Sequence, residues 1–200
     1  TFFDLMLMER RPQKHVDIAA WQQFLFNSCL TNKPWHTLAR EILAADGADE
    51  ATRVAARFHL DREADPNLLT RDTGRIFFGM NLACAQCHDD PRTADYLQRD
   101  YQGLFAFFNR TYLFTRDRDK KAFVAEKAEV DVSFASVFTK EPGATRPRLP
   151  GGAQLTEPAF PRFAEYTVPP DAKDKNLRPV PKFNRRAALA KAATESNNRA

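Results

Sequence analysis

The clearest chemistry in this sequence comes from two cysteines and a histidine in the stretch CAQCH, residues 84–88. Two thiols three positions apart, Cys84 and Cys87, can each add to a vinyl group of one haem. The neighbouring imidazole of His88 can then bind the iron from one side. From the chain's own counts of cysteine and histidine, this C-x-x-C-H pattern arises by accident roughly once in 1,700 such sequences. We therefore predict that Cys84, Cys87 and His88 bind haem c, with His88 as the metal ligand.

A second axial ligand for the iron is less obvious. Residues 89–200 contain neither histidine nor methionine. Met80 lies four residues before Cys84 and is expected near the edge of a bound ring rather than across it. His36 and His59 are favoured because they lie on other predicted elements, although an exposed or hydrogen-bonded side chain is the ordinary interpretation of each. The remaining upstream candidates are His15, Met6 and Met8.

Three other uses of the same residues stay open. Cys84 and Cys87 could form a disulfide or a redox-active pair, which needs only the two thiols. A zinc ion could take the two cysteines and His88, with an oxygen from Asp89 or Asp90, but structural zinc sites use a second ligand pair that the sequence lacks. A metal-dependent hydrolase could use His88 with Asp89 or Asp90. No nucleophile accompanies these residues, so the sequence assigns no catalytic residue and leaves enzyme activity undecided.

Composition limits the class of protein. The chain has 200 residues, of which 43% are hydrophobic and 17 are phenylalanine, enough to build a core. Its formal charge of +4 is spread along the sequence rather than clustered, so nucleic-acid binding is not expected. No apolar run approaches the roughly 18 residues that would span a membrane. The third cysteine, Cys29, is expected to be a small core residue.

Apolar spacing predicts helices before and after the motif. A further helix, capped by Thr70 or Asp72, is expected to run through residues 74–87 and to present Cys84 and Cys87 on one face. The other predicted helices cover residues 16–30, 34–46 and 94–108. Together they predict a mainly α fold, a helical domain with a small β-hairpin and a proline-rich extended C-terminal arm.

The domain organisation follows from changes in composition. Residues 1–115 are predicted to form the helical domain that carries the C-x-x-C-H motif, and residues 116–140 a small β addition. The alternation of Val130, Val132, Phe134 and Val137 indicates that hairpin. Residues 141–184 hold 9 of the 13 prolines and predict a linker or wrapping arm. Residues 185–200 are expected to begin a following, truncated helical domain.

Three segments in this order resemble a known family. They are FNSCLTNKPWHTLAREILAADG (26–47), TGRIFFGMNLACAQCHDDP (73–91) and DYQGLFAFFNR (100–110). The combination is similar to the planctomycete-type cytochrome-associated domain of unknown function, an exported multi-domain family with a C-A-Q-C-H-D block. The end of the chain, RRAALAKAATESNNRA, looks like the entry to the second uncharacterised domain usually fused behind it.

The resemblance implies a large exported protein whose activity is not established. It also implies that Cys84, Cys87 and His88 are the haem-binding residues. This chain departs from the family pattern directly after them, because Asp90 stands where the family has a second histidine. That change weakens a metal-hydrolase hypothesis more than haem attachment, which needs only the two cysteines and the first histidine.

The sequence therefore favours a c-type haem-binding electron-transfer domain of a larger exported protein. Covalent haem attachment takes place outside the cytoplasm, so we expect a periplasmic or cell-surface location, with a signal peptide upstream of this piece. The expected partners are other domains of the same chain and a redox partner protein. The alternative from another class is a non-redox structural, assembly or surface-binding module with a Cys84–Cys87 disulfide.

Overall fold

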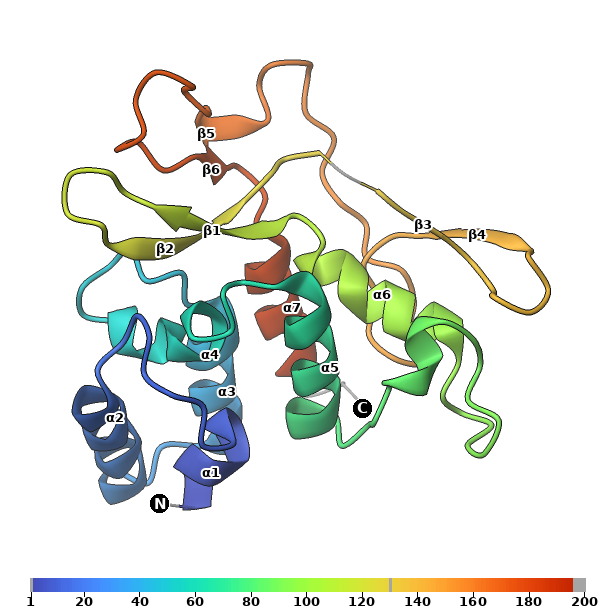
Figure 1. Ribbon diagram of the computed structural model, residues 1–200, viewed down its shortest axis with the longest axis horizontal. Coiled ribbons are helices and arrows are strands. Elements are labelled where there is room, and N and C mark those ends of the chain that lie inside the picture. The colour runs from blue at the N-terminus through green and yellow to red at the C-terminus, as the bar shows by residue number, and fades with distance from the viewer. Residues whose placement is uncertain (1, 130, 196–200) are drawn as a thin grey trace.

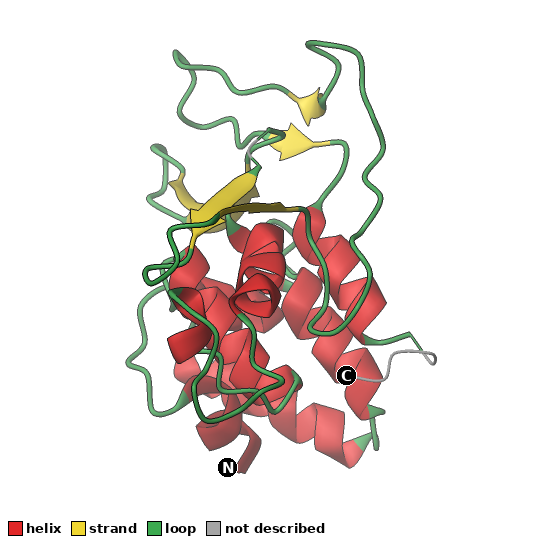
Figure 2. Ribbon diagram, turned by 90° about the vertical axis from the view of Figure 1, so that its right-hand side faces the viewer, coloured by secondary structure: helices red, strands yellow, loops and turns green. Residues whose placement is uncertain are grey.

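The computed structural model describes residues 2–129 and 131–195. Helices form the lower layer in Figure 1, and hairpins and long connecting segments lie above them. Figure 2 shows the same division from the side, with the strands stacked over one end of the helical layer. The helices are α1 (Phe2–Met8), α2 (Ile18–Leu30), α3 (Trp35–Ala44), η1 (Arg53–Ala56), α4 (Arg57–Leu60), α5 (Pro66–Phe77), η2 (Cys84–Gln86), α6 (Gln98–Phe108) and α7 (Arg185–Ala193).

Strands pair only with neighbours in antiparallel hairpins in the described part of the chain. The strands are β1 (Thr111–Thr115), β2 (Ala122–Glu126), β3 (Val132–Ala135), β4 (Pro142–Thr145), β5 (Tyr166–Val168) and β6 (Val180–Pro181). β1 pairs with β2 in the register Thr111↔Glu126, and β3 pairs with β4 in the register Val132↔Thr145. β5 and β6 form a short, irregular pair.

The prediction of a mainly α fold is wrong. Of the described residues, 38% are helical and 13% lie in strands, so this is a mixed α/β protein in which the strands form small hairpins. The residues expected to form one hairpin, 121–140, instead supply strands to two different hairpins. The predicted alternation also includes Val130, which lies outside the described residues. The sequence pattern failed here because short β-branched and aromatic strands such as β1 follow directly on an equally apolar helix.

The main core lies between the helices of the lower layer. Its buried apolar residues are Leu7, Met8, Trp21, Leu25, Leu38, Ile42, Phe58, Leu69, Leu82, Ala85, Tyr101, Leu104, Phe107, Phe108 and Leu189. The aromatic run of α6 (Leu104–Phe108) is therefore core, as its helical spacing indicates. Cys29 is exposed on α2, so the expectation that it is a core residue is wrong. It lies beside the exposed Phe26 and Leu30, on the side of α2 that faces away from the core.

The last described helix, α7, completes this core. The sequence predicts that residues 185–200 begin a following, truncated helical domain. Instead α7 packs between α3 and α6, and Leu189 is fully buried in the main cluster (Figure 1). Residues 196–200 lie outside the described residues. The domain boundaries themselves stay a prediction.

Two adjacent arginines at the start of α7 are buried and bind partners from distant parts of the chain, although Nη2 of Arg186 has no hydrogen-bond partner among the described residues. Arg186 donates from Nε to Glu126 on β2 at 2.7 Å and from Nη1 to the carbonyl of Ala45 at 2.8 Å. Arg185 donates from Nε and Nη2 to the two carboxylate oxygens of Glu157, each at 2.6 Å. These pairs bind α7 to the end of α3, to β2 and to the proline-rich segment.

Loss of one partner in this network should strongly destabilise the fold. Arg186→Ala leaves the carboxylate of Glu126 buried without its cation, so we expect the free energy of unfolding to fall by about 3–5 kcal/mol. Lys191→Ala, on the exposed side of the same helix, should change it by less than about 0.5 kcal/mol. Urea denaturation followed by circular dichroism measures both. A loss below about 1 kcal/mol for Arg186→Ala would mean that α7 is dispensable for this fold.

Candidate functional site

The motif cysteines lie on a short 3-10 turn rather than on the expected helix. Asp65 caps α5 by accepting a hydrogen bond from the backbone of Leu68 at 2.8 Å, so the predicted caps Thr70 and Asp72 lie inside the helix. α5 ends at Phe77. Gly79 then takes a φ of +66°, a left-handed conformation that glycine adopts without strain and that turns the chain away.

Both thiols still point to the same side of the chain. The backbone N–H of Cys87 donates to the carbonyl of Cys84 at 3.2 Å, which closes the 3-10 turn η2. Side chains three residues apart are close to eclipsed in this type of turn, so Cys84 and Cys87 leave the backbone in similar directions. Cys84 and Cys87 are exposed and are not joined by a disulfide in the described structure. Ala85, between them, is buried in the main core and anchors the turn.

The ring of His88 is held in one orientation. Its Nδ1 lies 2.7 Å from the backbone carbonyl oxygen of Asp89. A carbonyl can only accept a hydrogen bond, so Nδ1 must carry the proton and donate it. The hydrogen bonds of the described residues include none to Nε2 of His88, the ring nitrogen that would be left to bind a metal. Metal-binding histidines usually donate their other ring N–H in this way, to a carbonyl or a carboxylate.

Two glutamines of α6 hold the backbone of the motif, and sequence reasoning missed both. Gln98 donates from Nε2 to the carbonyls of Cys87 at 3.1 Å and of Ala135 at 3.2 Å. Gln102, one turn later, donates from Nε2 to the carbonyl of Gln86 at 3.0 Å. Both glutamines are buried, which is unusual for this residue type. Their spacing of four residues on one helix face is the only signal of this role in the sequence.

Helix α5 also holds the motif, through hydrogen bonds to Asn67. Asn67 on α5 accepts hydrogen bonds at Oδ1 from Nε2 of Gln86 at 3.2 Å and from the hydroxyl of Tyr101 at 2.9 Å. Burial raises the pKa of the Tyr101 hydroxyl well above its ordinary value, so this group stays protonated as a donor. The turn is thus bound to both α5 and α6 through side-chain amides and one phenol.

The aspartates that follow the motif have structural roles. Oδ1 of Asp89 accepts a hydrogen bond from the backbone of Gln98 at 2.7 Å, at the start of α6, where a carboxylate is favoured. Oδ1 of Asp90 accepts from the backbone of Arg92 at 2.8 Å and of Thr93 at 3.1 Å, which closes a tight turn. Within the described residues, no group of three or more histidine, cysteine, aspartate or glutamate side chains is placed to hold a metal ion. The zinc and metal-hydrolase hypotheses therefore gain no support.

The tip of the β3–β4 hairpin lies against the motif. The backbone N–H of Val137 donates to the carbonyl of Cys87 at 3.2 Å. The ring of Phe138 lies over the imidazole of His88, with 4.9 Å between ring centroids and 50° between ring planes. A cavity of about 270 Å³ lies beside the motif, lined by Asp89, Gln98 and hairpin residues, and neither thiol nor His88 lines it.

The histidines favoured as a second iron ligand are placed elsewhere. His59 is fully buried, and its Nε2 lies 3.0 Å from the carbonyl oxygen of Leu43. Burial, and then the charge of Arg186, lower the pKa of His59 well below its ordinary value. His36 is exposed near the start of α3, and His15 pairs with Glu63. The structure does not gather any of them with His88 in a metal-binding cluster of the described residues.

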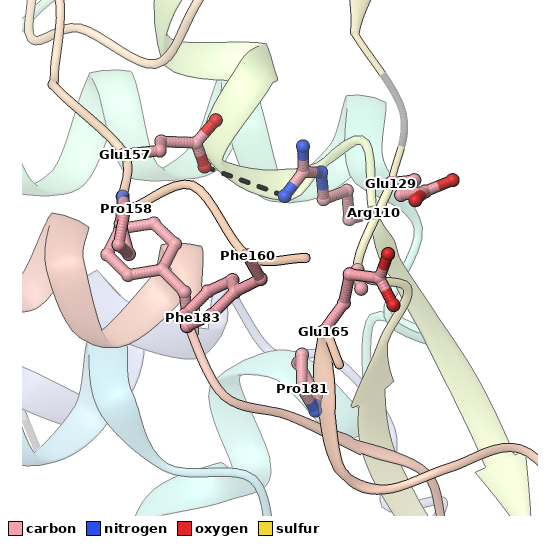
Figure 3. A pocket seen from close by; sticks show the side chains of 9 residues that line it. Arg110, Glu129, Glu157, Pro158, Phe160, Glu165, Pro181 and Phe183 are labelled. Carbon is pink, nitrogen blue, oxygen red and sulfur yellow. Dashed lines mark ion pairs between the residues drawn. The ribbon is translucent and has the colours of Figure 1, made fainter. Parts of the chain in front are cut away.

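A different pocket collects charged and aromatic side chains near the proline-rich segment (Figure 3). It measures about 190 Å³, and Phe160 and Phe183 face it from one side and Glu165 from the other. Arg110 forms an ion pair with Glu157 at 3.5 Å. Burial alone would raise the pKa of Glu157, but hydrogen bonds from Arg185 and the charges of Arg185 and Arg110 hold it below its ordinary value. These charges belong to the network that anchors α7, and the pocket shares no residue with the motif.

The chain is therefore a mixed α/β domain that displays a C-x-x-C-H turn on its surface. It belongs to the PSCyt2 family, described as a protein of unknown function (DUF1549), whose profile matches residues 4–112. This match confirms the resemblance to a planctomycete-type domain of unknown function, while the C-A-Q-C-H-D block as a family feature and the second domain stay predictions. No curated protein and no solved structure matches the chain. In the described residues, no helix has the length and apolar character needed to cross a membrane.

Buried His59 should make the fold sensitive to mild acid. Its pKa is lowered in the folded state, so below about pH 6.5 the unfolded chain binds a proton that the folded chain does not. The free energy of unfolding should then fall as the pH drops from about 6.5 to 5, by up to about 1.4 kcal/mol per pH unit. His59→Gln should remove this slope, and His36→Gln should keep it. Urea titrations at several pH values measure the slope, and its absence in the wild type would contradict the assignment.

Gln98 should be needed to hold the hairpin on the motif. Gln98→Ala removes the donor shared by the carbonyls of Cys87 and Ala135. We therefore expect the free energy of unfolding to fall by about 1–3 kcal/mol. Amide hydrogen exchange should speed up across residues 132–145 more than in α2. Arg99→Ala, on the exposed neighbouring position, is the matched control and should change neither quantity. Equal exchange in both variants would show that the hairpin does not depend on Gln98.

Proposed function

We propose that the domain attaches haem c through Cys84, Cys87 and His88 and serves electron transfer within a larger exported protein. The single observation that carries the proposal is the state of His88. Its Nδ1–H is donated to the carbonyl of Asp89, which leaves Nε2 to bind a metal, and the two exposed thiols lie one and four residues earlier in the chain. A merely structural histidine on the surface needs no such orientation.

The donor set supports attachment of a porphyrin. Cys84 and Cys87 would hold it by thioether bonds, in which each S–H adds across one vinyl C=C bond. Sulfur goes to one carbon and hydrogen to the other, so the addition needs no oxidant. Haem, when bound, supplies a one-electron iron couple. His88 would hold the iron, and the backbone that carries all three side chains is fixed by Gln98 and Gln102.

The thiols of the motif are exposed at the surface. The neighbouring cavity of about 270 Å³ is below the range of about 300–1,000 Å³ that is usual for ligand pockets. A haem attached to exposed thiols would keep an edge at the surface, where a redox partner or another domain of the chain can approach. Because covalent attachment occurs outside the cytoplasm, the proposal includes a periplasmic or cell-surface location.

Covalent haem is the direct test of this proposal. The full-length protein should be co-expressed with a haem-maturation system, purified and denatured on a gel. We expect haem-stained protein with a Soret band that is lost completely in Cys84→Ala/Cys87→Ala. Cys29→Ala is the matched control and should keep the haem.

A different result would favour the structural alternative. Colourless wild-type protein in which Cys29 reacts with thiol reagents and Cys84 and Cys87 do not would indicate a Cys84–Cys87 disulfide in a non-redox module. Reduction would then lower the free energy of unfolding. Elemental analysis of the same preparation separates iron from zinc and from no metal.

A further inference from the structure

The β3–β4 hairpin brings exposed apolar surface to the motif from a distant part of the chain. Phe138 is 73% exposed and Val137 is 45% exposed, at the tip of the hairpin. Both lie outside residues 4–112, the part that the family profile matches. Isolated exposed apolar side chains are common, so their exposure alone implies nothing. Val137 and Phe138 differ from such isolated side chains because hydrogen bonds fix the hairpin tip that carries them.

Hydrogen bonds fix the hairpin tip against the motif at two points. The carbonyl of Cys87 accepts from the backbone of Val137 at 3.2 Å, and Gln98 bridges that carbonyl to the one of Ala135. The turn itself is shaped by Ser136, whose hydroxyl oxygen accepts from the backbone of Phe138 at 3.3 Å. The tip therefore has a defined position relative to the cysteines, which a loose loop would not have.

The aromatic ring at the tip also contacts the proposed iron ligand. Phe138 and His88 lie with ring centroids 4.9 Å apart. Thus one small surface presents two thiols, an imidazole with a free Nε2 and an exposed aromatic ring. A flat, mostly apolar ring bound through the thiols and the imidazole would cover Phe138 and Val137 and remove their apolar surface from water.

We infer that Val137 and Phe138 form an apolar wall that binds the face or edge of a porphyrin held at Cys84, Cys87 and His88. This inference rests on the proposed function and extends it to the β3–β4 hairpin. The wall contributes by apolar burial, so it should also strengthen the binding of a porphyrin that carries no iron and forms no covalent bond. That property separates its test from the test of haem attachment.

Porphyrin binding without iron and without thioether bonds measures the wall directly. In the Cys84→Ala/Cys87→Ala background, the full-length protein is titrated with metal-free protoporphyrin IX and binding is followed by porphyrin fluorescence. Phe138→Ser should weaken binding at least about tenfold, since burial of a phenylalanine is worth about that factor or more. Phe138→Leu keeps an apolar side chain and should bind within about threefold of the background.

Phe163→Ser is the matched control. Phe163 is 87% exposed and lies in the proline-rich segment, so its loss should change binding less than about twofold. Three outcomes would each overturn the inference. Phe138→Ser could bind as tightly as the background, Phe163→Ser could weaken binding as much as Phe138→Ser does, or the background could fail to bind protoporphyrin IX. Circular dichroism of each variant verifies that the fold is retained.

The two proposals can fail separately. Covalent haem in the wild type together with unchanged protoporphyrin binding by Phe138→Ser would support haem attachment and overturn the apolar wall. A colourless wild type whose protoporphyrin binding depends on Phe138 would support the wall and overturn covalent attachment.

Discussion

The position of the motif depends on two hydrogen bonds to the carbonyl oxygen of Cys87. A carbonyl has two lone pairs, and here one accepts from the side chain of Gln98 and the other from the backbone of Val137. These two bonds join three segments, the C-x-x-C-H turn, helix α6 and the β3–β4 hairpin. Buried hydrogen bonds of this kind add little net free energy when made, but each is costly when one partner is removed. The exposed side chains of the motif can therefore occupy defined positions although they lie on a short turn at the surface.

The frame around the site is held by buried ion pairs that link distant parts of the chain. Arg62 donates to Asp72 on α5 at 2.6 Å and lies over the ring of Phe58 with 4.0 Å to its centroid. Arg186 reaches Glu126, 60 residues earlier in the chain. Each arginine pairs with a carboxylate and donates to a backbone carbonyl, which offsets the cost of keeping the charge inside the protein. As a result, the segment beyond the family match is part of the same core as the matched residues 4–112.

Local patterns in the sequence predicted the parts of this protein that depend on local spacing. The helices α2, α3 and α6 follow from residues close together in the chain, whereas the helix predicted to carry the C-x-x-C-H motif is a short 3-10 turn in the structure. The end of α5 was missed because apolar residues continue past Phe77, and only the left-handed Gly79 stops the helix. Gln98 was missed because its two acceptors lie 11 and 37 residues away. The buried arginines were missed for the same reason, since a charged residue is recognised as buried only when its distant partner is known.

The central claim is that the aligned thiols beside an oriented imidazole exist to carry haem. Intact-mass and peptide mass spectrometry of the full-length protein from its natural host tests this claim most directly. The account predicts a covalently bound haem on the peptide that contains both Cys84 and Cys87. An unmodified mass, or two cysteines joined only to each other, would contradict it.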